Sequence, residues 1–123
     1  MDLNLERPGD HLFIRSFTGK GIQVVDEFYT SSIILSANEV IPDWPVSDVG
    51  NMTEEDLRKV LGLKPEVVLI GCGENQTFLS PEQMMFFYSR NVGVEVMTTP
   101  AACRTYNVLV SELRNVVAAL IQP

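Results

Sequence analysis

Residues 67–73 of the chain read Val-Val-Leu-Ile-Gly-Cys-Gly, and this stretch decides the fold class. The run from Val67 to Ile70 is apolar without interruption, which is typical of a β-strand that is covered on both faces. Strands of this kind belong to parallel sheets that carry helices on their faces. Gly71 and Gly73 follow the strand directly and favour a turn. The stretch therefore predicts a parallel sheet with a loop at its carboxyl edge.

Two helices are predicted next to this strand. Before it, Thr53 is suited to be the N-cap of a helix with acidic residues in its first turn, and Gly62 ends the helix. After it, residues 80–83 read Ser-Pro-Glu-Gln, a capping box with proline at the first helical position. We expect this second helix to turn three apolar residues inward: Met84, Phe87 and Tyr88.

The alternation continues to the C-terminus. Residues 92–96 alternate valine with glycine and glutamate, as a strand does, and Thr99-Pro100 begins a helix that runs to about Val110. The last element, from about residue 112 to residue 121, is apolar enough to be mostly buried. Helix, strand, helix, strand and helix in this order imply βαβ units around a parallel sheet.

The N-terminal third predicts strands instead of helices. Residues 12–17 and 22–25 are rich in β-branched and aromatic residues and are separated by Thr-Gly-Lys-Gly, which indicates a β-hairpin. A third β run extends from Phe28 to Leu35. Together these elements predict an α/β fold: a three-layer single domain over residues 1–123, whose mixed central sheet of parallel βαβ units is flanked by helices and joined by an N-terminal antiparallel hairpin.

Composition and charge exclude several classes of protein. The chain has 123 residues, is 46% hydrophobic and carries a net charge of −7, and no cluster of basic residues exceeds the pair Arg58 and Lys59. We therefore expect no nucleic-acid partner. No apolar stretch approaches the roughly 20 residues of a membrane span, so we expect no direct membrane insertion. Residues 1–10 resemble no leader peptide, and we expect a cytoplasmic location with reduced thiols.

A ligand crevice is predicted beyond the carboxyl ends of the parallel strands, where loops from several strands meet. The strand ending at Ile70, the strand ending near Met97 and the β run that leads toward Trp44 all contribute residues to that edge. The candidate binding residues are Trp44, Gly71, Cys72, Gly73, Thr98, Thr99, Cys103, Arg104, Thr105 and Asn107.

Several of these candidates have two interpretations. The glycines either approach a ligand or only serve a turn. Cys103 lies near a helix N-terminus beside Arg104, which favours a reactive thiolate, but a free cysteine is more often a core residue. Arg104 either holds an anion or pairs with Glu112 or a carbonyl. Trp44 is a ligand wall, a partner anchor or a lid over the core, and the core interpretation is preferred.

Catalytic and metal-binding groups are few in this sequence. His11 is the only histidine, and with two scattered thiols it supplies neither a zinc ligand set nor a nucleophile, base and orienting triad. No Walker-type phosphate loop is present, and Gly71-Cys72-Gly73 lacks the third glycine of a dinucleotide fingerprint. We expect no cofactor, no metal and no enzymatic activity.

Three stretches together resemble the domain-of-unknown-function 498 family over about residues 10–121: residues 21–45, 65–73 and 94–109. The block from Ala101 to Leu109, Ala-Ala-Cys-Arg-Thr-Tyr-Asn-Val-Leu, is the most specific. The family includes bacterial proteins, an adipogenesis-associated cytosolic branch and the mitochondrial complex I assembly factor three. The resemblance implies a three-layer α/β fold and a role without established catalysis.

The chain departs from the family pattern in two places. Relatives often carry glycine where this chain has Leu113, which predicts a less sharp break between the last two helices. Relatives also often have Asp-Thr-Gly where residues 98–100 are Thr-Thr-Pro, which removes support for an anion or metal role of this loop.

Three hypotheses of function follow. The first is a non-catalytic, assembly-factor-like domain that binds a partner protein, including one in a membrane-associated complex. The alternative is a small-molecule or thiol-redox protein that uses the sheet-edge pocket around Cys72, Cys103 and Arg104. The third is a structural homo-oligomer without a ligand.

Overall fold

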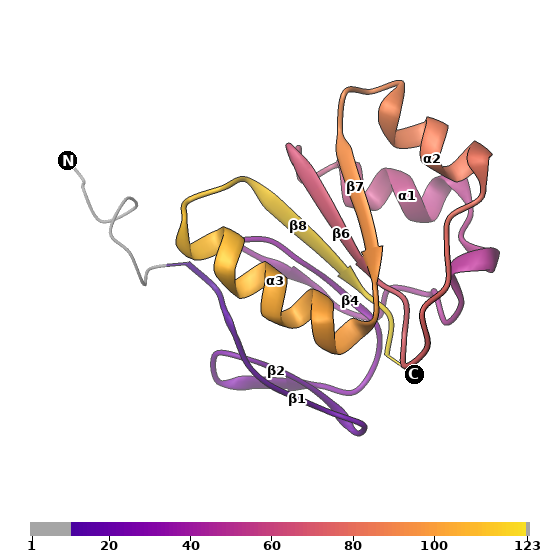
Figure 1. Cartoon of the computed structure of the whole chain (residues 1–123). Coiled ribbons are helices and arrows are strands. Elements are labelled where there is room, and N and C mark those ends of the chain that lie inside the picture. Colours follow the sequence, from indigo (N-terminus) through magenta and orange to yellow (C-terminus); the bar gives the residue numbers. More distant parts are fainter. Residues whose placement is uncertain (1–10, 123) are drawn as a thin grey trace.

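The computed structural model describes residues 11–122 and is built around a five-stranded mixed sheet (Figure 1). Three neighbouring strands run parallel to one another, the fourth is antiparallel to them, and the fifth, at the far edge, is antiparallel to the fourth. The order across the sheet is β5 (Val40–Ile41), β4 (Ile33–Leu35), β8 (Val116–Leu120), β6 (Val67–Gly71) and β7 (Gly93–Met97). The mixed central sheet predicted from the sequence is confirmed, and the apolar run at residues 67–70 lies in its parallel part.

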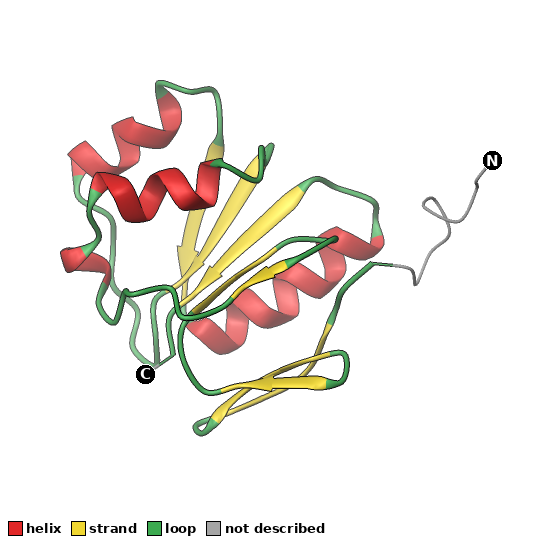
Figure 2. Cartoon of the chain, turned by 180° about the vertical axis from the view of Figure 1, so that it is seen from behind, coloured by secondary structure: helices red, strands yellow, loops and turns green. Residues whose placement is uncertain are grey.

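Two further layers cover this sheet, which confirms the three-layer α/β architecture (Figure 2). On one face lie α1 (Glu54–Leu61) and α2 (Pro81–Tyr88), with a short 3₁₀ helix at Val49–Asn51. On the other face lies α3 (Thr99–Ser111), beside a separate antiparallel sheet of three strands. These strands are β1 (Ile14–Thr18), β2 (Gly21–Val24) and β3 (Glu27–Tyr29), of which β1 and β2 are the predicted hairpin.

The central strands divide their side chains between two cores. Along β8, Val117 and Ala119 pack toward α1 and α2, while Val116, Ala118 and Leu120 pack toward α3 and the hairpin. All five residues of β8 are at most 1% exposed. This alternation follows from the two-residue repeat of a strand, and it explains why the sequence of a doubly covered strand is apolar without interruption.

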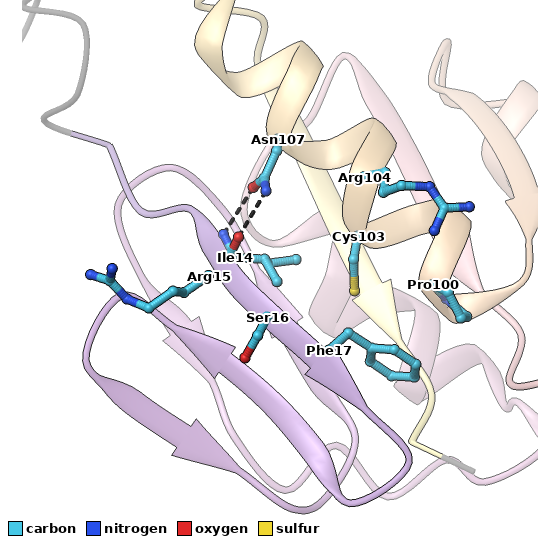
Figure 3. Close-up of a pocket in the computed structure, with 8 residues that line it drawn as sticks. All are labelled: Ile14, Arg15, Ser16, Phe17, Pro100, Cys103, Arg104 and Asn107. Carbon is cyan, nitrogen blue, oxygen red and sulfur yellow. Dashed lines mark hydrogen bonds between the residues drawn. The ribbon is translucent and has the colours of Figure 1, made fainter.

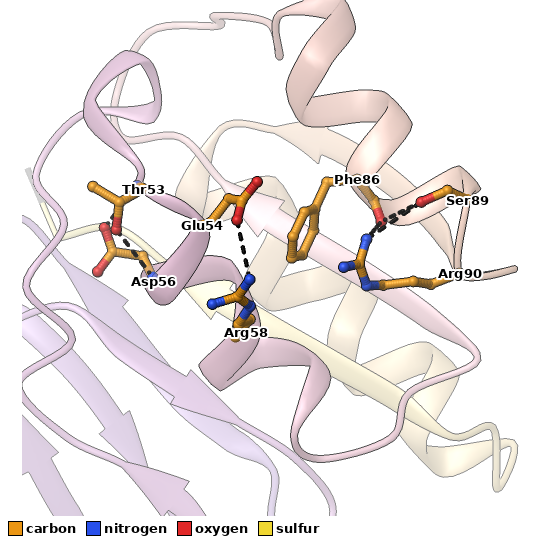
Figure 4. A network of polar contacts seen from close by, with 7 residues as sticks. All are labelled: Thr53, Glu54, Asp56, Arg58, Phe86, Ser89 and Arg90. Carbon is orange, nitrogen blue, oxygen red and sulfur yellow. Dashed lines mark hydrogen bonds and ion pairs between the residues drawn. The ribbon is translucent and has the colours of Figure 1, made fainter.

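The capping box predicted at α2 is present, and the N-cap predicted at α1 also forms a capping box, which Figure 4 shows. At α1, Thr53 Oγ1 accepts a hydrogen bond from the Asp56 N–H at 3.2 Å, and Asp56 Oδ2 accepts one from the Thr53 N–H at 2.9 Å. At α2, Ser80 and Gln83 exchange the same pair of bonds. A cap of this kind stabilises a helix by about 0.5–2 kcal/mol. The chain therefore enters both helices at the residues that the sequence predicts.

Three sequence-based expectations are wrong. The segment from residue 112 to 121 is not a last helix: α3 ends at Ser111, and Val116–Leu120 form the central strand β8. The β run from Phe28 to Leu35 is split between two sheets, because β3 pairs with β2 whereas β4 pairs with β8. Tyr88 does not face inward, since it is 50% exposed, and Phe86 is buried in its place.

The break after α3 is sharp, although Leu113 stands where relatives carry glycine. Leu113 adopts a φ of 62°, the left-handed conformation that costs a side-chain-bearing residue about 1–2 kcal/mol. We expect Leu113→Gly to raise the free energy of unfolding by about 0.5–1 kcal/mol. Glycine relieves the backbone strain of the left-handed conformation, and this gain exceeds the cost of the greater entropy that glycine gives the unfolded chain.

The measurement is urea unfolding followed by circular dichroism. Leu113→Ala is the matched control, because alanine keeps the unfavourable φ and should not stabilise the chain. Equal stability of the glycine and alanine variants would contradict a strained turn.

Residues 1–10, on which the expectation about a leader peptide rests, lie outside the described residues. Across residues 11–122, no helix has the length and apolarity needed to cross a membrane.

Candidate functional site

The loop after β6 is fastened to α3 and to the end of β8 by Thr99, which is fully buried. The Gly73 N–H donates to Thr99 Oγ1 at 2.8 Å, and the same hydroxyl donates to the Ile121 carbonyl at 2.7 Å. A Cβ at Gly71 would lie 3.0 Å from both Cα and Oγ1 of Thr99, and Gly73 has a φ of +100°. Gly71, Gly73 and Thr99, which the sequence predicts as site residues, therefore hold the loop in place. Both hydrogen bonds of the Thr99 hydroxyl are made within the protein.

Cys72 borders a polar pocket of about 260 Å³ at the carboxyl edge of the sheet. Its Sγ donates to the Asn75 carbonyl at 3.4 Å and accepts from the Thr77 N–H at 3.4 Å, so the half-buried thiol is engaged with its own loop. The pocket is lined by Ser47, Asp48, Cys72, Gly73, Glu74, Asn75, Thr77 and Ile121. This lining holds two carboxylates and no basic side chain.

A second pocket, the α3–β1 pocket, lies between the first turns of α3 and strand β1 and has a volume of about 230 Å³ (Figure 3). Its lining consists of Ile14, Arg15, Ser16, Phe17, Pro100, Cys103, Arg104 and Asn107. Asn107 joins its two walls: its Oδ1 accepts from the Ile14 N–H at 2.8 Å and its Nδ2 donates to the Ile14 carbonyl at 2.8 Å. The side-chain amide thus replaces a neighbouring strand at this point of β1 and fixes the hairpin to α3.

Cys103 forms part of the buried wall of the α3–β1 pocket. Burial raises the pKa of its thiol to about 12, although the positive charge of Arg104 acts in the opposite direction. Desolvation therefore outweighs the nearby guanidinium. At neutral pH the thiol is protonated, which favours the interpretation of Cys103 as a core residue over that of a nucleophile.

We expect iodoacetamide at pH 7.5 to alkylate Cys103 of the folded chain more slowly than free cysteine by a factor of roughly a thousand. The reason is that a thiol with a raised pKa has very little thiolate at this pH, and burial also limits access. Mass spectrometry of the Cys72→Ser variant isolates the reaction at Cys103, and the same variant in urea is the control. Rapid labelling of the folded variant at Cys103 would restore the redox hypothesis.

Arg104 lies exposed at the rim of the α3–β1 pocket. Its side chain makes no ion pair or hydrogen bond with residues 11–122, so neither the alternative pair with Glu112 nor a bond to a carbonyl forms there. The other arginine of the rim, Arg15, lies 3.7 Å from Asp26. In Figure 3 the two guanidinium groups point away from each other on opposite sides of the pocket, so they do not form a clamp for a single anion.

Trp44, Thr98 and Thr105 have three different environments. Trp44 is 3% exposed in the core beneath α1, and its indole N–H donates to the Asp56 carbonyl at 3.3 Å. Thr98 is the N-cap of α3 but makes no side-chain capping bond, while Pro100 occupies the first turn as predicted. Thr105 is half-buried on α3.

The structure divides the predicted pocket in two. Cys72 and Trp44 pack toward the core of α1 and α2, whereas Cys103 belongs to the core of α3 and the hairpin. The physical reason is that the central sheet separates these cores. Cys103, Arg104 and Asn107 are brought together, but their partners in the pocket are β1 residues that the sequence does not predict.

The contribution of residues 14–17 had no local signal in the sequence. They reach the site because β1 pairs with β2, and the free edge of β1 bonds to Asn107, which lies 93 positions after Ile14 in the chain. Among the described residues there is no group of three or more His, Cys, Asp or Glu that would hold a metal ion.

A known protein family matches most of the chain. The description "Protein of unknown function (DUF498/DUF598)" applies to residues 14–121. A solved structure, that of a protein from Xanthomonas campestris, is 39% identical and superimposes with a TM-score of 0.83 over 98% of this chain and 92% of that protein.

Two relatives carry descriptive names. The "13 kDa major membrane protein" of Francisella tularensis subsp. holarctica is 32% identical over 98% of this chain and 99% of its own length. The "NADH dehydrogenase [ubiquinone] 1 alpha subcomplex assembly factor 3" of Mus musculus is also 32% identical, over 91% of this chain. The match spans only 61% of the length of the mouse protein.

Proposed function

The chain belongs to the DUF498/DUF598 family of proteins of unknown function, and from this premise we propose that it is a non-catalytic, assembly-factor-like domain that binds a partner protein. The observation that carries the proposal is the similarity of nearly the whole chain to a protein named as an assembly factor of NADH dehydrogenase. The protonated thiol of Cys103 and the small number of catalytic groups point in the same direction.

The partner belongs, in this proposal, to a membrane-associated complex. Support comes from two names, that of the mouse assembly factor and that of the Francisella membrane protein. The described residues contain no helix suited to span a membrane, so contact with such a complex would pass through a protein surface. We place the chain in the cytoplasm, bound to the membrane through its partner.

The outer face of α3 is the surface that we assign to this partner. Arg104 and Val108 are exposed one helical turn apart, and Val108 is 55% exposed. A guanidinium beside an exposed apolar side chain is a frequent combination in protein interfaces, where arginine is enriched among the residues that dominate affinity. Asn107 holds this helix rigidly against the hairpin, so the surface is formed before the partner binds.

The test is a tagged pull-down from the native cell, including the detergent-solubilised membrane fraction, with Arg104→Glu. We expect the variant to recover at least about tenfold less partner than the unmodified chain. The reason is that a charge reversal at a central contact typically costs over about 1.4 kcal/mol of binding free energy. Circular dichroism should show that the variant is folded, since Arg104 makes no contact on which the described fold depends.

The matched control is Arg58→Glu, which reverses an exposed charge on α1, at the opposite face of the sheet. It should recover the partner as the unmodified chain does. Recovery of one defined complex by all three proteins would remove Arg104 from the interface, and recovery of no complex by the unmodified chain would contradict the assembly-factor role.

A second candidate function is the binding of a small ligand in the α3–β1 pocket. The observation in its favour is a half-open hollow in which the apolar side chains of Ile14 and Phe17 lie beside the polar Ser16 and Arg104. At about 230 Å³ it is smaller than the usual ligand pocket of roughly 300–1,000 Å³. A thiol-redox function that joins Cys72 and Cys103 is disfavoured, since the two thiols belong to different cores.

A further inference from the structure

β7 is the outer strand of the central sheet, and its free edge carries unpaired backbone groups. The Gly93 N–H donates to the Glu66 carbonyl at 3.2 Å, and the Met97 carbonyl accepts from the Cys72 N–H at 2.8 Å, so both residues direct their backbone toward β6. Because successive residues of a strand direct these groups to alternate sides, Val94 and Val96 direct theirs outward. One of the four outward groups, the Val96 carbonyl, accepts from Gln76 Nε2 at 3.2 Å.

The remaining three groups, the N–H and carbonyl of Val94 and the N–H of Val96, have no protein partner among the described residues. An open strand edge of this kind is a template for pairing with another extended chain. Proteins often protect such an edge with a charge or a covering loop, and here the cover is limited to the single bond from Gln76.

Apolar side chains border this edge on the side of α2. Phe87 is fully buried and faces the sheet, while Phe86 lines the hollow between α1 and α2 and carries the guanidinium of Arg90 over its ring at 3.9 Å (Figure 4). The helical repeat then places Met84 and Tyr88, which lie one turn apart, on the side of α2 that faces away from α1. Since α2 packs on β7, this is the side of the open edge.

A loop adds a second apolar group beside the same edge. Gln76 bonds the Val96 carbonyl, and Phe78, two residues later, is 77% exposed. Tyr88 is 50% exposed and Met85, next to it on α2, 60%. Exposed aromatic and methionine side chains are typical of surfaces that bind proteins.

The opposite flank of the edge is acidic. Val94 and Val96 pack their side chains toward α1 and α2, so Glu95 projects on the face of the sheet that α3 covers. Glu95 is exposed and makes no ion pair with the described residues. An added strand would therefore meet apolar groups on one face and a carboxylate on the other.

A second copy of the chain fits this edge poorly. Antiparallel pairing of β7 over its whole length would place Glu95 directly opposite Glu95 of the other copy. Like charges that lie directly opposite each other in a sheet are destabilising. The acidic central residue thus disfavours self-pairing and favours a strand with a basic residue at the matching position.

We propose that the outer edge of β7 binds an extended segment of a partner protein as a sixth strand, with apolar side chains against Met84, Tyr88 and Phe78 and a lysine or arginine against Glu95. This is the β-strand addition mode, in which backbone hydrogen bonds supply affinity and alternate side chains supply specificity. The site needs neither Arg104 nor the α3–β1 pocket, so it extends the proposed function to a separate surface.

The test titrates the ¹⁵N-labelled chain with two capped peptides, acetyl-Lys-Val-Lys-Val-Lys-amide and acetyl-Glu-Val-Glu-Val-Glu-amide. We expect the amide signals of Val94 and Val96 to shift and the lysine peptide to bind about tenfold more tightly at low salt. Glu95→Lys should reverse this preference. Glu112→Lys, which makes the same change of charge on an exposed residue after α3, should leave the preference as it is.

Several outcomes would overturn the proposal: no binding of either peptide at millimolar concentration, shifts confined to other strands, or a preference that Glu95→Lys does not alter. Light scattering tests whether a second copy of the chain occupies the edge instead. A dimer that becomes monomeric in Val96→Pro, which removes one outward N–H, would assign the edge to a second copy. Arg104→Glu should bind the lysine peptide as the unmodified chain does. Absence of peptide binding at β7 and absence of a partner in the pull-down are therefore separate results.

Discussion

Replacement of Trp44 by alanine is expected to lower the free energy of unfolding by about 3–5 kcal/mol. Trp44 is 3% exposed in the core beneath α1, so the change opens a cavity, and it also removes the donor to the Asp56 carbonyl. Domains of this size are stable by only about 5–15 kcal/mol, so the variant should be close to unfolding at physiological temperature.

Urea unfolding followed by far-ultraviolet circular dichroism is the suitable measurement, because Trp44 is the only tryptophan and its fluorescence is lost in the variant. Trp44→Phe is the control, and it should cost less since the ring fills part of the cavity. A loss below about 1 kcal/mol in Trp44→Ala would contradict the core assignment and would favour the role of a partner anchor or ligand wall.

Replacement of Thr99 by valine is expected to destabilise the chain by about 2–5 kcal/mol. Valine preserves the shape of the side chain but leaves two buried groups without their partner, the Gly73 N–H and the Ile121 carbonyl. Each unsatisfied group of this kind costs about 1–3 kcal/mol.

Thr99→Ser is the matched control, because serine keeps the hydroxyl and loses only a methyl group. It should therefore be clearly more stable than Thr99→Val in the same urea titration. Equal losses in the two variants would show that packing, and not the two hydrogen bonds, makes Thr99 important. An unchanged stability of Thr99→Val would instead return Thr99 to the list of ligand-binding residues.

The two variants bear on the candidate site as well as on stability. Trp44, Gly71, Gly73 and Thr99 are candidate site residues by their place at or near the carboxyl edge of the sheet, and each of them has a structural contact in the fold. Arg104 differs from them, since it is exposed and contributes nothing visible to the described core. For this reason Arg104 is the residue replaced in the test of partner binding, and Trp44 and Thr99 are the residues replaced in the tests of stability.

The helices of this chain were predictable from local signals. Thr53, Ser80 and Pro100 mark helix starts through hydrogen bonds and backbone angles that involve only their near neighbours. The doubly covered strand β6 was predictable for a similar reason, because burial on both faces leaves an apolar run. At residues 112–121 a short apolar run does not by periodicity distinguish a buried helix from a strand, and the expected helix is the strand β8.

The candidate site was predictable only in part. Cys103, Arg104 and Asn107 share a helix, so the sequence alone placed them together. Their partners on β1 were not predictable, because the hydrogen bonds between Asn107 and Ile14 join residues 93 positions apart. The open edge of β7 had no signal either, since the sequence of β7 does not show on which side its neighbour lies.

The amino-acid sequence by itself determined the fold class, the helix starts, the family and the shortage of catalytic groups, because these depend on patterns within about a dozen residues or on composition. The tertiary structure alone decided that β8 is the central strand, that Cys72 and Cys103 lie in different cores, and that β7 presents an open edge beside Tyr88 and Glu95. The physical reason is that strand order and the pairing of distant segments are set by which apolar faces pack together, and that choice is made by the whole chain at once.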